Sequence, residues 1–128
     1  MNGYSPLVRE LFATLPGSGP LPPGPGEVLA GEAGDLLAGA WVRFEARIED
    51  GRIVAARFAA WGCPHTLAAA AWVTQRLPGL DPADAGELAA PRRLAATLAA
   101  PAGKLGRLLQ VEDALRALVE ARGAVGKR

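Results

Sequence analysis

The sequence has very little cysteine and histidine, since Cys63 and His65 are the single examples among 128 residues. One cysteine cannot form an internal disulfide, so we expect a reducing, cytoplasmic setting. It also excludes a metal site built from four cysteines of one chain. Any sulfur chemistry of this chain therefore depends on Cys63.

Neither sign of charge is in clear excess, because 14 Lys and Arg residues nearly balance 13 Asp and Glu residues, for a net charge of +1. The sequence therefore predicts no basic surface for nucleic acid. No hydrophobic run approaches the ~20 residues of a membrane-spanning helix, and residues 1–15 lack the layout of a signal peptide. We expect neither nucleic acid nor membrane as a partner.

The length suits a single domain of residues 1–128 with three parts. An N-terminal helix is expected at residues 5–15, where Ser5 suits the N-cap and Pro6 the first turn. Residues 16–26 (PGSGPLPPGPG) form a Pro/Gly linker, because proline removes hydrogen-bond donors and glycine adds entropy. Such a linker would leave the first helix free to swing. The core would then span residues 27–128.

A small sheet is predicted at the start of this core. Residues 41–48 alternate between apolar and polar side chains, which is typical of a half-buried strand. Asp50 and Gly51 predict a hairpin turn. The return strand at residues 52–60 is expected to bury Val54, Ala56 and Phe58, and a weaker strand is expected at residues 27–30.

The rest of the chain predicts helices. One begins at Pro64 and ends near Arg76, two short ones are expected within residues 81–90 and 91–100, and the last begins at Lys104 and ends near residue 122. A strand block followed by a helix block predicts an α+β fold. We expect a small antiparallel three-stranded sheet with helices packed on one face.

Cys63 is predicted at the N-cap of the helix that begins at Pro64. The unpaired N–H groups and partial positive charge of a helix N-terminus favour a thiolate over a thiol. Local sequence alone is compatible with a buried packing residue, a metal ligand or a nucleophile. His65 follows two residues later, but residues at this spacing do not share a helix face, so His65 is equally compatible with a capping or surface role. One Cys and one His are too few for a zinc site.

Three stretches of the chain together resemble the IscU/NifU (SufU-like) family of iron–sulfur cluster assembly scaffolds. They are YSPLVRELF from Tyr4, DGRIVAARFAAWGCPHTLAAAAWVTQRLPG from Asp50 and KLGRLLQVEDALRALVEA from Lys104. The most specific parts are residues 56–63 (ARFAAWGC) and the EDA segment at residues 112–114. The resemblance implies an IscU/SufE-like fold. It also implies a protein that receives sulfur from a cysteine desulfurase, builds a [2Fe–2S] cluster and passes it on.

The chain departs from the family at two of its three ligand cysteines. Cys63 matches the middle cysteine. The first falls either at residues 33–35, which retain Asp35 as an acidic ligand, or at Ala38 and Gly39 in a gapless alignment. The third falls at residues 106–107, where Arg107 stands. Because iron–sulfur clusters are held chiefly by thiolates, we expect no stable cluster in the monomer, with iron or a [2Fe–2S] cluster bound at most transiently.

The favoured function is a sulfur carrier rather than an enzyme. Cys63 would accept persulfide sulfur from a desulfurase, and Arg107 would stabilise the thiolate, with protonated His65 as a supplement. One alternative is a pseudo-scaffold that binds a desulfurase or another assembly partner without chemistry. A second is a homodimer in which Cys63 and His65 of both chains share a [2Fe–2S] cluster. A Cys–His hydrolase lacks a visible orienting acid or oxyanion motif.

Overall fold

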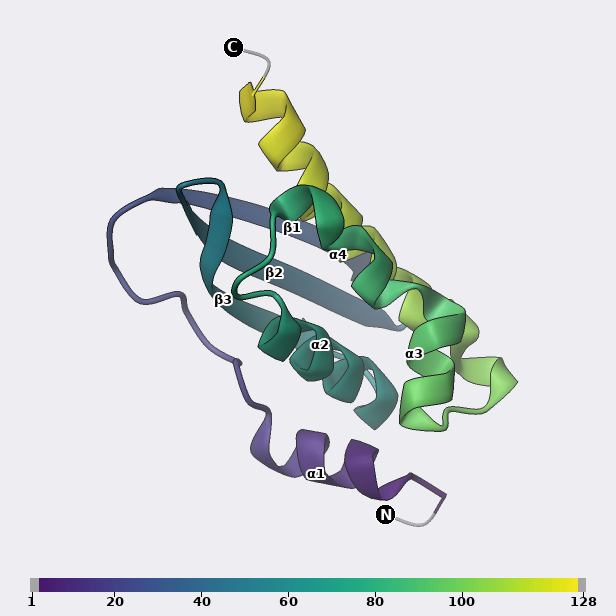
Figure 1. The fold of residues 1–128 in the computed structure, drawn as a ribbon. Helices are drawn as coiled ribbons and strands as arrows, with labels where there is room; N and C mark the ends of the chain where they lie inside the picture. Colours follow the sequence, from purple (N-terminus) through teal and green to yellow (C-terminus); the bar gives the residue numbers. More distant parts are fainter. Residues whose placement is uncertain (1–2, 127–128) are drawn as a thin grey trace.

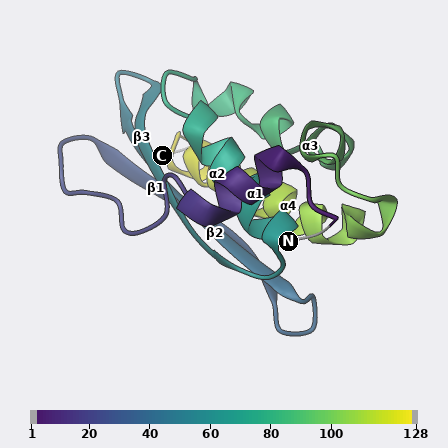
Figure 2. The same ribbon diagram turned by 90° about the horizontal axis from the view of Figure 1, so that it is seen from below.

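The computed structural model describes the backbone of residues 3–126 and the side chains of residues 3–121. In chain order the elements are α1 (Pro6–Thr14), β1 (Glu27–Asp35), β2 (Ala40–Glu49), β3 (Arg52–Trp61), α2 (Pro64–Arg76), the 3-10 turns η1 (Pro82–Asp84) and η2 (Gly86–Ala89), α3 (Pro91–Leu98), η3 (Ala102–Lys104) and α4 (Leu105–Gly126). The strands form one antiparallel sheet in the order β1-β2-β3. The helices cover one of its faces (Figures 1 and 2), so the predicted α+β fold is confirmed.

The predicted alternation of β2 places Val42, Phe44 and Ala46 in the core, where each has no exposed surface. Asp50 and Gly51 both have positive φ, of 52° and 78°, as a two-residue hairpin turn requires. Phe58 on β3 is 2% exposed, as the sequence predicts. The hydrophobic pattern and the turn residues therefore fix the inner face of this hairpin.

The predicted burial of Val54 is wrong. The pairing register shifts next to Arg47, which pairs with Ala55, while Ile48 pairs with Ile53. Val54 is the extra residue of this β-bulge and is 44% exposed, whereas Ile53 is 1% exposed. A bulge leaves one residue unpaired and interrupts the alternation of side chains, so the inward positions shift by one.

Strand β1 is longer than the expected strand at residues 27–30, since it continues to Asp35. Its second half is rich in small residues, which give little strand signal on their own. Gly31 is buried, and a Cβ there would collide with the backbone N of Leu118 and the carbonyl oxygen of Ala114. The small residues thus let α4 lie directly on β1.

The helices begin where the sequence predicts. Ser5 caps α1, because its hydroxyl accepts a hydrogen bond from the Val8 N–H at 3.2 Å. Residues 81–90 differ from the expected helix and form the two 3-10 turns instead. This stretch is short, is bounded by Pro82 and Pro91 and contains Gly86, so a run of i→i+4 hydrogen bonds is not favoured.

Residues 16–26 have no helix or strand of their own, but they are anchored to the sheet. The Gly17 carbonyl accepts the Phe58 N–H at 2.9 Å, and the Gly19 N–H donates to the Phe58 carbonyl at 3.0 Å. Arg47 donates to the carbonyl oxygens of Gly24, at 2.7 Å, and of Pro22. The segment therefore lies along the free edge of β3 and does not leave α1 free to swing.

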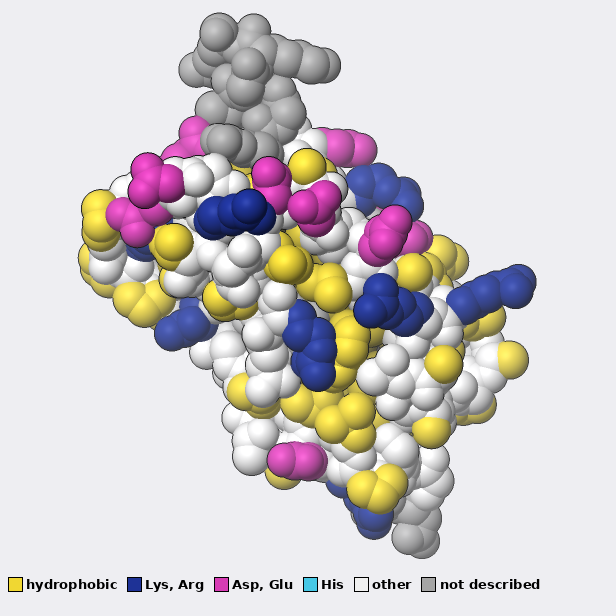
Figure 3. All heavy atoms as spheres, in the orientation of Figure 1, with side chains coloured by type: hydrophobic (Ala, Val, Ile, Leu, Met, Phe, Trp, Pro, Cys, Tyr) yellow, Lys and Arg dark blue, Asp and Glu magenta, His cyan; other side chains and the backbone are white. Residues whose placement is uncertain are grey.

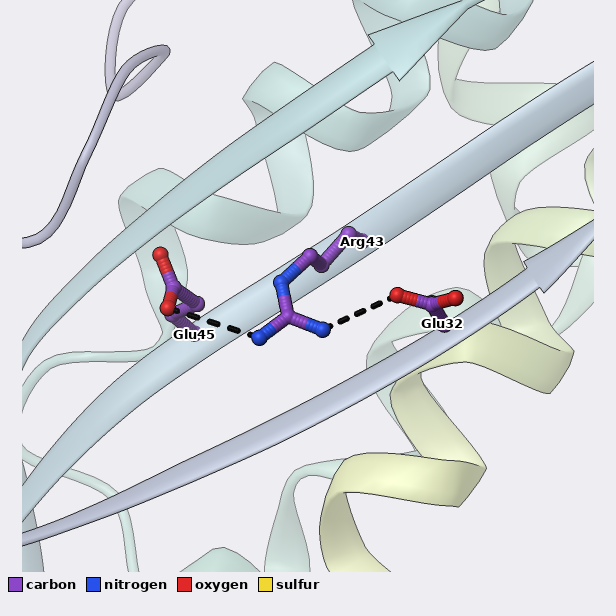
Figure 4. A network of polar contacts seen from close by, with 3 residues as sticks. All are labelled: Glu32, Arg43 and Glu45. Atoms are coloured by element: carbon purple, nitrogen blue, oxygen red, sulfur yellow. Dashed lines mark hydrogen bonds and ion pairs between the residues drawn. The ribbon is translucent and has the colours of Figure 1, made fainter.

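The other face of the sheet is polar. Arg43 on β2 forms ion pairs with Glu32 on β1, at 2.9 Å, and with Glu45, at 3.6 Å (Figure 4). These side chains are partly exposed and alternate with the buried residues of β2. Within residues 3–126, no helix is both long enough and apolar enough to span a membrane.

Candidate functional site

Cys63 lies at the junction of β3 and α2, as the N-cap that the sequence predicts. Its backbone is extended, with φ −74° and ψ 165°, and its side chain does not cap the helix backbone through a standard hydrogen bond. Gly62 has φ +145°, and a Cβ there would lie 3.2 Å from Thr66 and 3.3 Å from the Cβ of Ala40. A glycine is therefore needed to turn the chain sharply from strand to helix. The thiol is partly buried at this turn.

The surroundings of Cys63 favour the thiolate. Burial raises the pKa of the Cys63 thiol, but contacts with the backbone and hydroxyl of Thr66, the backbone of His65 and the charge of Lys104 lower the pKa by more. The net pKa lies below the ordinary value. The sulfur lies 3.6 Å from the Thr66 hydroxyl oxygen. These contacts are what a helix N-terminus and a nearby cation supply to a reactive cysteine.

His65 is a buried residue, which differs from the capping or surface role considered above. It is 2% exposed, and neither ring nitrogen has a hydrogen-bond partner. Its ring lies 4.8 Å from the ring of Tyr4, centre to centre, at an interplanar angle of 45°. Burial and the charge of Lys104 lower the pKa of His65, which favours the neutral imidazole.

Arg107 contacts the β1–β2 turn. Its guanidinium donates to the Ala38 carbonyl at 3.2 Å, and a Cβ on Gly39 would collide with it. Gly39 also has φ +74°, so both backbone conformation and space require glycine there. The cation that lowers the Cys63 pKa is Lys104, so Arg107 as a thiolate stabiliser stays a prediction. Asp35 is exposed, and its carboxylate accepts the Ala38 N–H at 2.8 Å within the turn.

Residues that the resemblance aligns with the ligands of the family lie at the end of the sheet formed by the β1–β2 turn and the end of β3. Ala40, at the start of β2, lies against Gly62 beside Cys63, and Arg107 contacts Ala38. In the gapless alignment the first and third positions are Ala38 and Arg107, whose methyl group and guanidinium do not coordinate iron. In the other alignment the first position is Ala33, followed by the exposed carboxylate of Asp35. Within the described part of the chain, no three His, Cys, Asp or Glu side chains group as metal ligands. The donor set of one chain does not fit a cluster.

Sequence reasoning missed Lys104 and Thr66. Thr66 stands three residues after the N-cap, a spacing that could have identified it as a neighbour of the sulfur. Lys104 is far from Cys63 in sequence, so its role depends on the tertiary fold. The end of the sheet formed by the β1–β2 turn and the end of β3 also exposes large apolar side chains. Leu36 is 86%, Leu37 99% and Trp61 40% exposed. Single exposed apolar residues are ordinary, but these three lie at the same end of the sheet, since Trp61 pairs with Trp41 next to the β1–β2 turn.

Comparisons with known proteins agree with this geometry. A nitrogen fixation protein NifU of Cereibacter sphaeroides is 41% identical over 81 residues, which cover 54% of this chain and 33% of that protein. The chain thus matches about a third of that relative's length.

Solved structures share the fold. One, named "Putative iron-sulfur cluster assembly scaffold protein for SUF system" from Fervidobacterium islandicum AW-1, has a TM-score of 0.65 at 13% identity, covering 91% of this chain and 96% of that one. A nitrogen-fixing NifU-like protein (N-terminal) from Brucella abortus has a TM-score of 0.62 at 17% identity, covering 97% and 94%. The family model of the NifU-like N terminal domain matches residues 17–122, and the chain belongs to that family.

Proposed function

We propose that this protein acts in iron–sulfur cluster assembly as a sulfur carrier that works through Cys63 alone. The carrying observation is the partly exposed Cys63 thiol at the N-cap of α2, whose pKa is lowered by its surroundings. In the gapless alignment the other two ligand positions are Ala38 and Arg107, which offer no thiolate. Family membership supports the assembly role, and the single thiol favours sulfur transfer over cluster binding.

The transfer step follows ordinary thiol–disulfide chemistry. The Cys63 thiolate attacks the terminal sulfur of a persulfide on a cysteine desulfurase. A sulfur–sulfur bond forms at Cys63, the bond in the donor breaks, and the donor cysteine leaves as a thiolate. The proton on the transferred sulfur stays with it, so no oxidant or reductant is required. Lys104 favours the attacking thiolate, and Thr66 holds its position.

The desulfurase would dock over the end of the sheet where β3 leads to Cys63. Leu36 and Leu37 project from the β1–β2 turn, and Trp61 ends the strand that leads to the thiol. Burial of these side chains in a partner would remove apolar surface from water, at roughly 25 cal/mol per Å². A pseudo-scaffold would bind the desulfurase through the same surface without accepting sulfur. Sulfur transfer to Cys63 must therefore be measured separately from binding.

The test follows sulfur from ³⁵S-cysteine through a cysteine desulfurase to this protein. We expect wild-type protein to carry label that dithiothreitol releases, and Cys63→Ser to carry none while still binding the desulfurase. Lys104→Gln should raise the Cys63 pKa, so iodoacetamide alkylation measured against pH should shift its midpoint upward. Arg107→Gln is the matched control, and a shift there without a shift in Lys104→Gln would assign the cation to Arg107 instead.

Two results would contradict the proposal. Full rescue of cluster assembly by Cys63→Ser would make the protein a pseudo-scaffold. A stable coloured [2Fe–2S] species after reconstitution with iron and sulfide would contradict the carrier role. If that species eluted as a homodimer and disappeared in Cys63→Ser and His65→Leu, the cluster would be shared between two chains.

A further inference from the structure

The turn between β1 and β2 presents two large apolar side chains. Leu36 and Leu37 are 86% and 99% exposed. Within the turn, the Ala38 N–H donates to the Asp35 carboxylate at 2.8 Å. The Gly39 N–H donates to the carbonyl oxygens of Asp35 and Leu36, each at 3.2 Å. These local bonds fix the shape of the turn, but they do not determine where it lies relative to the helices.

Arg107 joins this turn to a helix. It lies in the first turn of α4, and its guanidinium donates to the Ala38 carbonyl at 3.2 Å. Among the described residues, this is the only hydrogen bond between residues 36–39 and an element outside the β1–β2 hairpin. Gly39 provides the space for the guanidinium, because a Cβ there would collide with it. The position of the turn therefore depends on Arg107.

The guanidinium of Arg107 is not part of a wider basic surface. Figure 3 shows Lys and Arg side chains scattered over the helix side of the molecule rather than gathered in one patch. No ion pair joins Arg107 to a carboxylate among the side chains that the structure describes. Its partner is a neutral backbone carbonyl, so the contact holds the turn rather than balancing a charge.

The resemblance to the family places Ala38 and Arg107 at two ligand positions. In the gapless alignment, they match the first and third cysteines. A metal bound by thiolates at both positions would join the β1–β2 turn to the start of α4. Neither residue offers a thiolate here, yet the two residues are in direct contact. A guanidinium only donates hydrogen bonds, so this connection needs no metal.

We propose that Arg107 takes the place of a metal as the connection between the β1–β2 turn and α4. It is a positioning residue, which keeps Leu36 and Leu37 in one place at the end of the sheet without any bound ligand. Lys104, by contrast, is the cation that acts on Cys63. The proposal rests on the sulfur-carrier function only for its effect on desulfurase docking, because the connection itself is a property of the free protein.

The order of the turn tests the connection directly. In Arg107→Met, which keeps a long side chain but no donor, the NMR order parameters of the Leu37 and Ala38 amides should fall from about 0.85 to below about 0.6. Amides in the middle of α4 should stay rigid, which shows that the variant is folded. Arg116→Met is the matched control, because Arg116 also lies on α4 but pairs with Glu112. An unchanged turn in Arg107→Met, or an equal loss of order in Arg116→Met, would overturn the proposal.

A metal can be introduced to test the replacement. Ala38→Cys together with Arg107→Cys places thiols at both ends of the connection, in addition to Cys63. Because three protein ligands and a water are a common donor set for zinc, we expect this variant to bind Zn²⁺ in calorimetry. With zinc bound, the turn should regain the order that Arg107→Met loses.

Ala33→Cys together with Arg107→Cys is the matched control for the zinc experiment. Ala33 is the first ligand position of the other alignment, and it lies within β1 rather than in the turn. Zinc should not restore the order of the turn in this control. Equal recovery in the control would overturn the proposal, and so would absence of zinc binding, or of recovery, in Ala38→Cys with Arg107→Cys.

Sulfur transfer from a desulfurase and ³⁵S-cysteine tests the consequence for docking. Arg107→Met should raise the KM for this protein as acceptor roughly fivefold or more, while kcat stays within about twofold. Arg107→Lys, which keeps a charged donor, should restore most of the loss. A fall in kcat together with slower alkylation of Cys63 would place Arg107 at the thiol and overturn its positioning role. Failure of the wild type to accept label would instead contradict the sulfur-carrier function, since the order of the turn is measured without a desulfurase.

Discussion

The surroundings of His65 lower the stability of the folded protein. A buried polar group without a hydrogen-bond partner costs about 1–3 kcal/mol, and both ring nitrogens of His65 are in this state. Burial and the charge of Lys104 lower the His65 pKa from 6.5 in the folded protein. Between the folded and unfolded pKa values, the unfolded chain binds more protons, so the free energy of unfolding falls as the pH decreases.

We therefore expect the melting temperature to fall as the pH is lowered from 7.5 through 6.5 to 5.5, and His65→Leu to flatten this dependence. Because leucine removes the unpartnered nitrogens, the variant should match or exceed the wild type at pH 7.5. His65 is the only histidine, so the difference between the two curves isolates its titration. The measurement is thermal unfolding followed by circular dichroism. Parallel curves for the two proteins would contradict the buried, neutral state of His65.

The residue scale also shows what sequence can predict about the site. The Gly-Cys-Pro order places Cys63 correctly at the N-cap, because Gly62 permits the turn and Pro64 suits the first helical position. Burial of His65 was not predictable, since its cover, Tyr4, comes from the N-terminal end of the chain, far from the middle of the chain where His65 lies. The effect of the Lys104 charge on Cys63 likewise depends on how η3 packs, which no local sequence pattern predicts.

At the scale of elements, alternation predicts which strands form but not where a bulge interrupts them. The bulge depends on how two strands pair, so it moves Ile53 into the core and Val54 outward without a signal in β3 itself. We expect Ile53→Ala to reduce the free energy of unfolding by about 2–5 kcal/mol. Val54→Ala should change it by about 0.5 kcal/mol or less, as an exposed position. Urea denaturation of both variants measures these losses. A larger loss in Val54→Ala than in Ile53→Ala would contradict the bulge and support an unbulged register.

At the scale of the whole molecule, α1 and residues 16–26 form one connected segment that is anchored both to the helices and to the sheet. Ser5 donates to the Leu98 carbonyl at 2.8 Å, Gly17 and Gly19 pair with Phe58, and Arg47 holds Pro22 and Gly24. Most of these contacts use backbone carbonyls and N–H groups, which do not depend on the type of side chain. Composition correctly predicts a segment without regular structure, but it cannot predict this anchoring.

Arg47 is the side chain that fixes this segment, and it is only 8% exposed. A hydrogen bond from a charged group contributes about 1.5–3 kcal/mol, so Arg47→Met should free residues 17–24 locally. The amides of Gly19 and Phe58 should then exchange hydrogen roughly tenfold faster, measured by NMR, while amides in the middle of α4 stay protected. Arg43→Met is the matched control, because Arg43 lies on the same strand and face but pairs with Glu32 and Glu45. Unchanged exchange in Arg47→Met would mean that the segment is held by β3 alone, and equal acceleration in both variants would mean a general loss of stability.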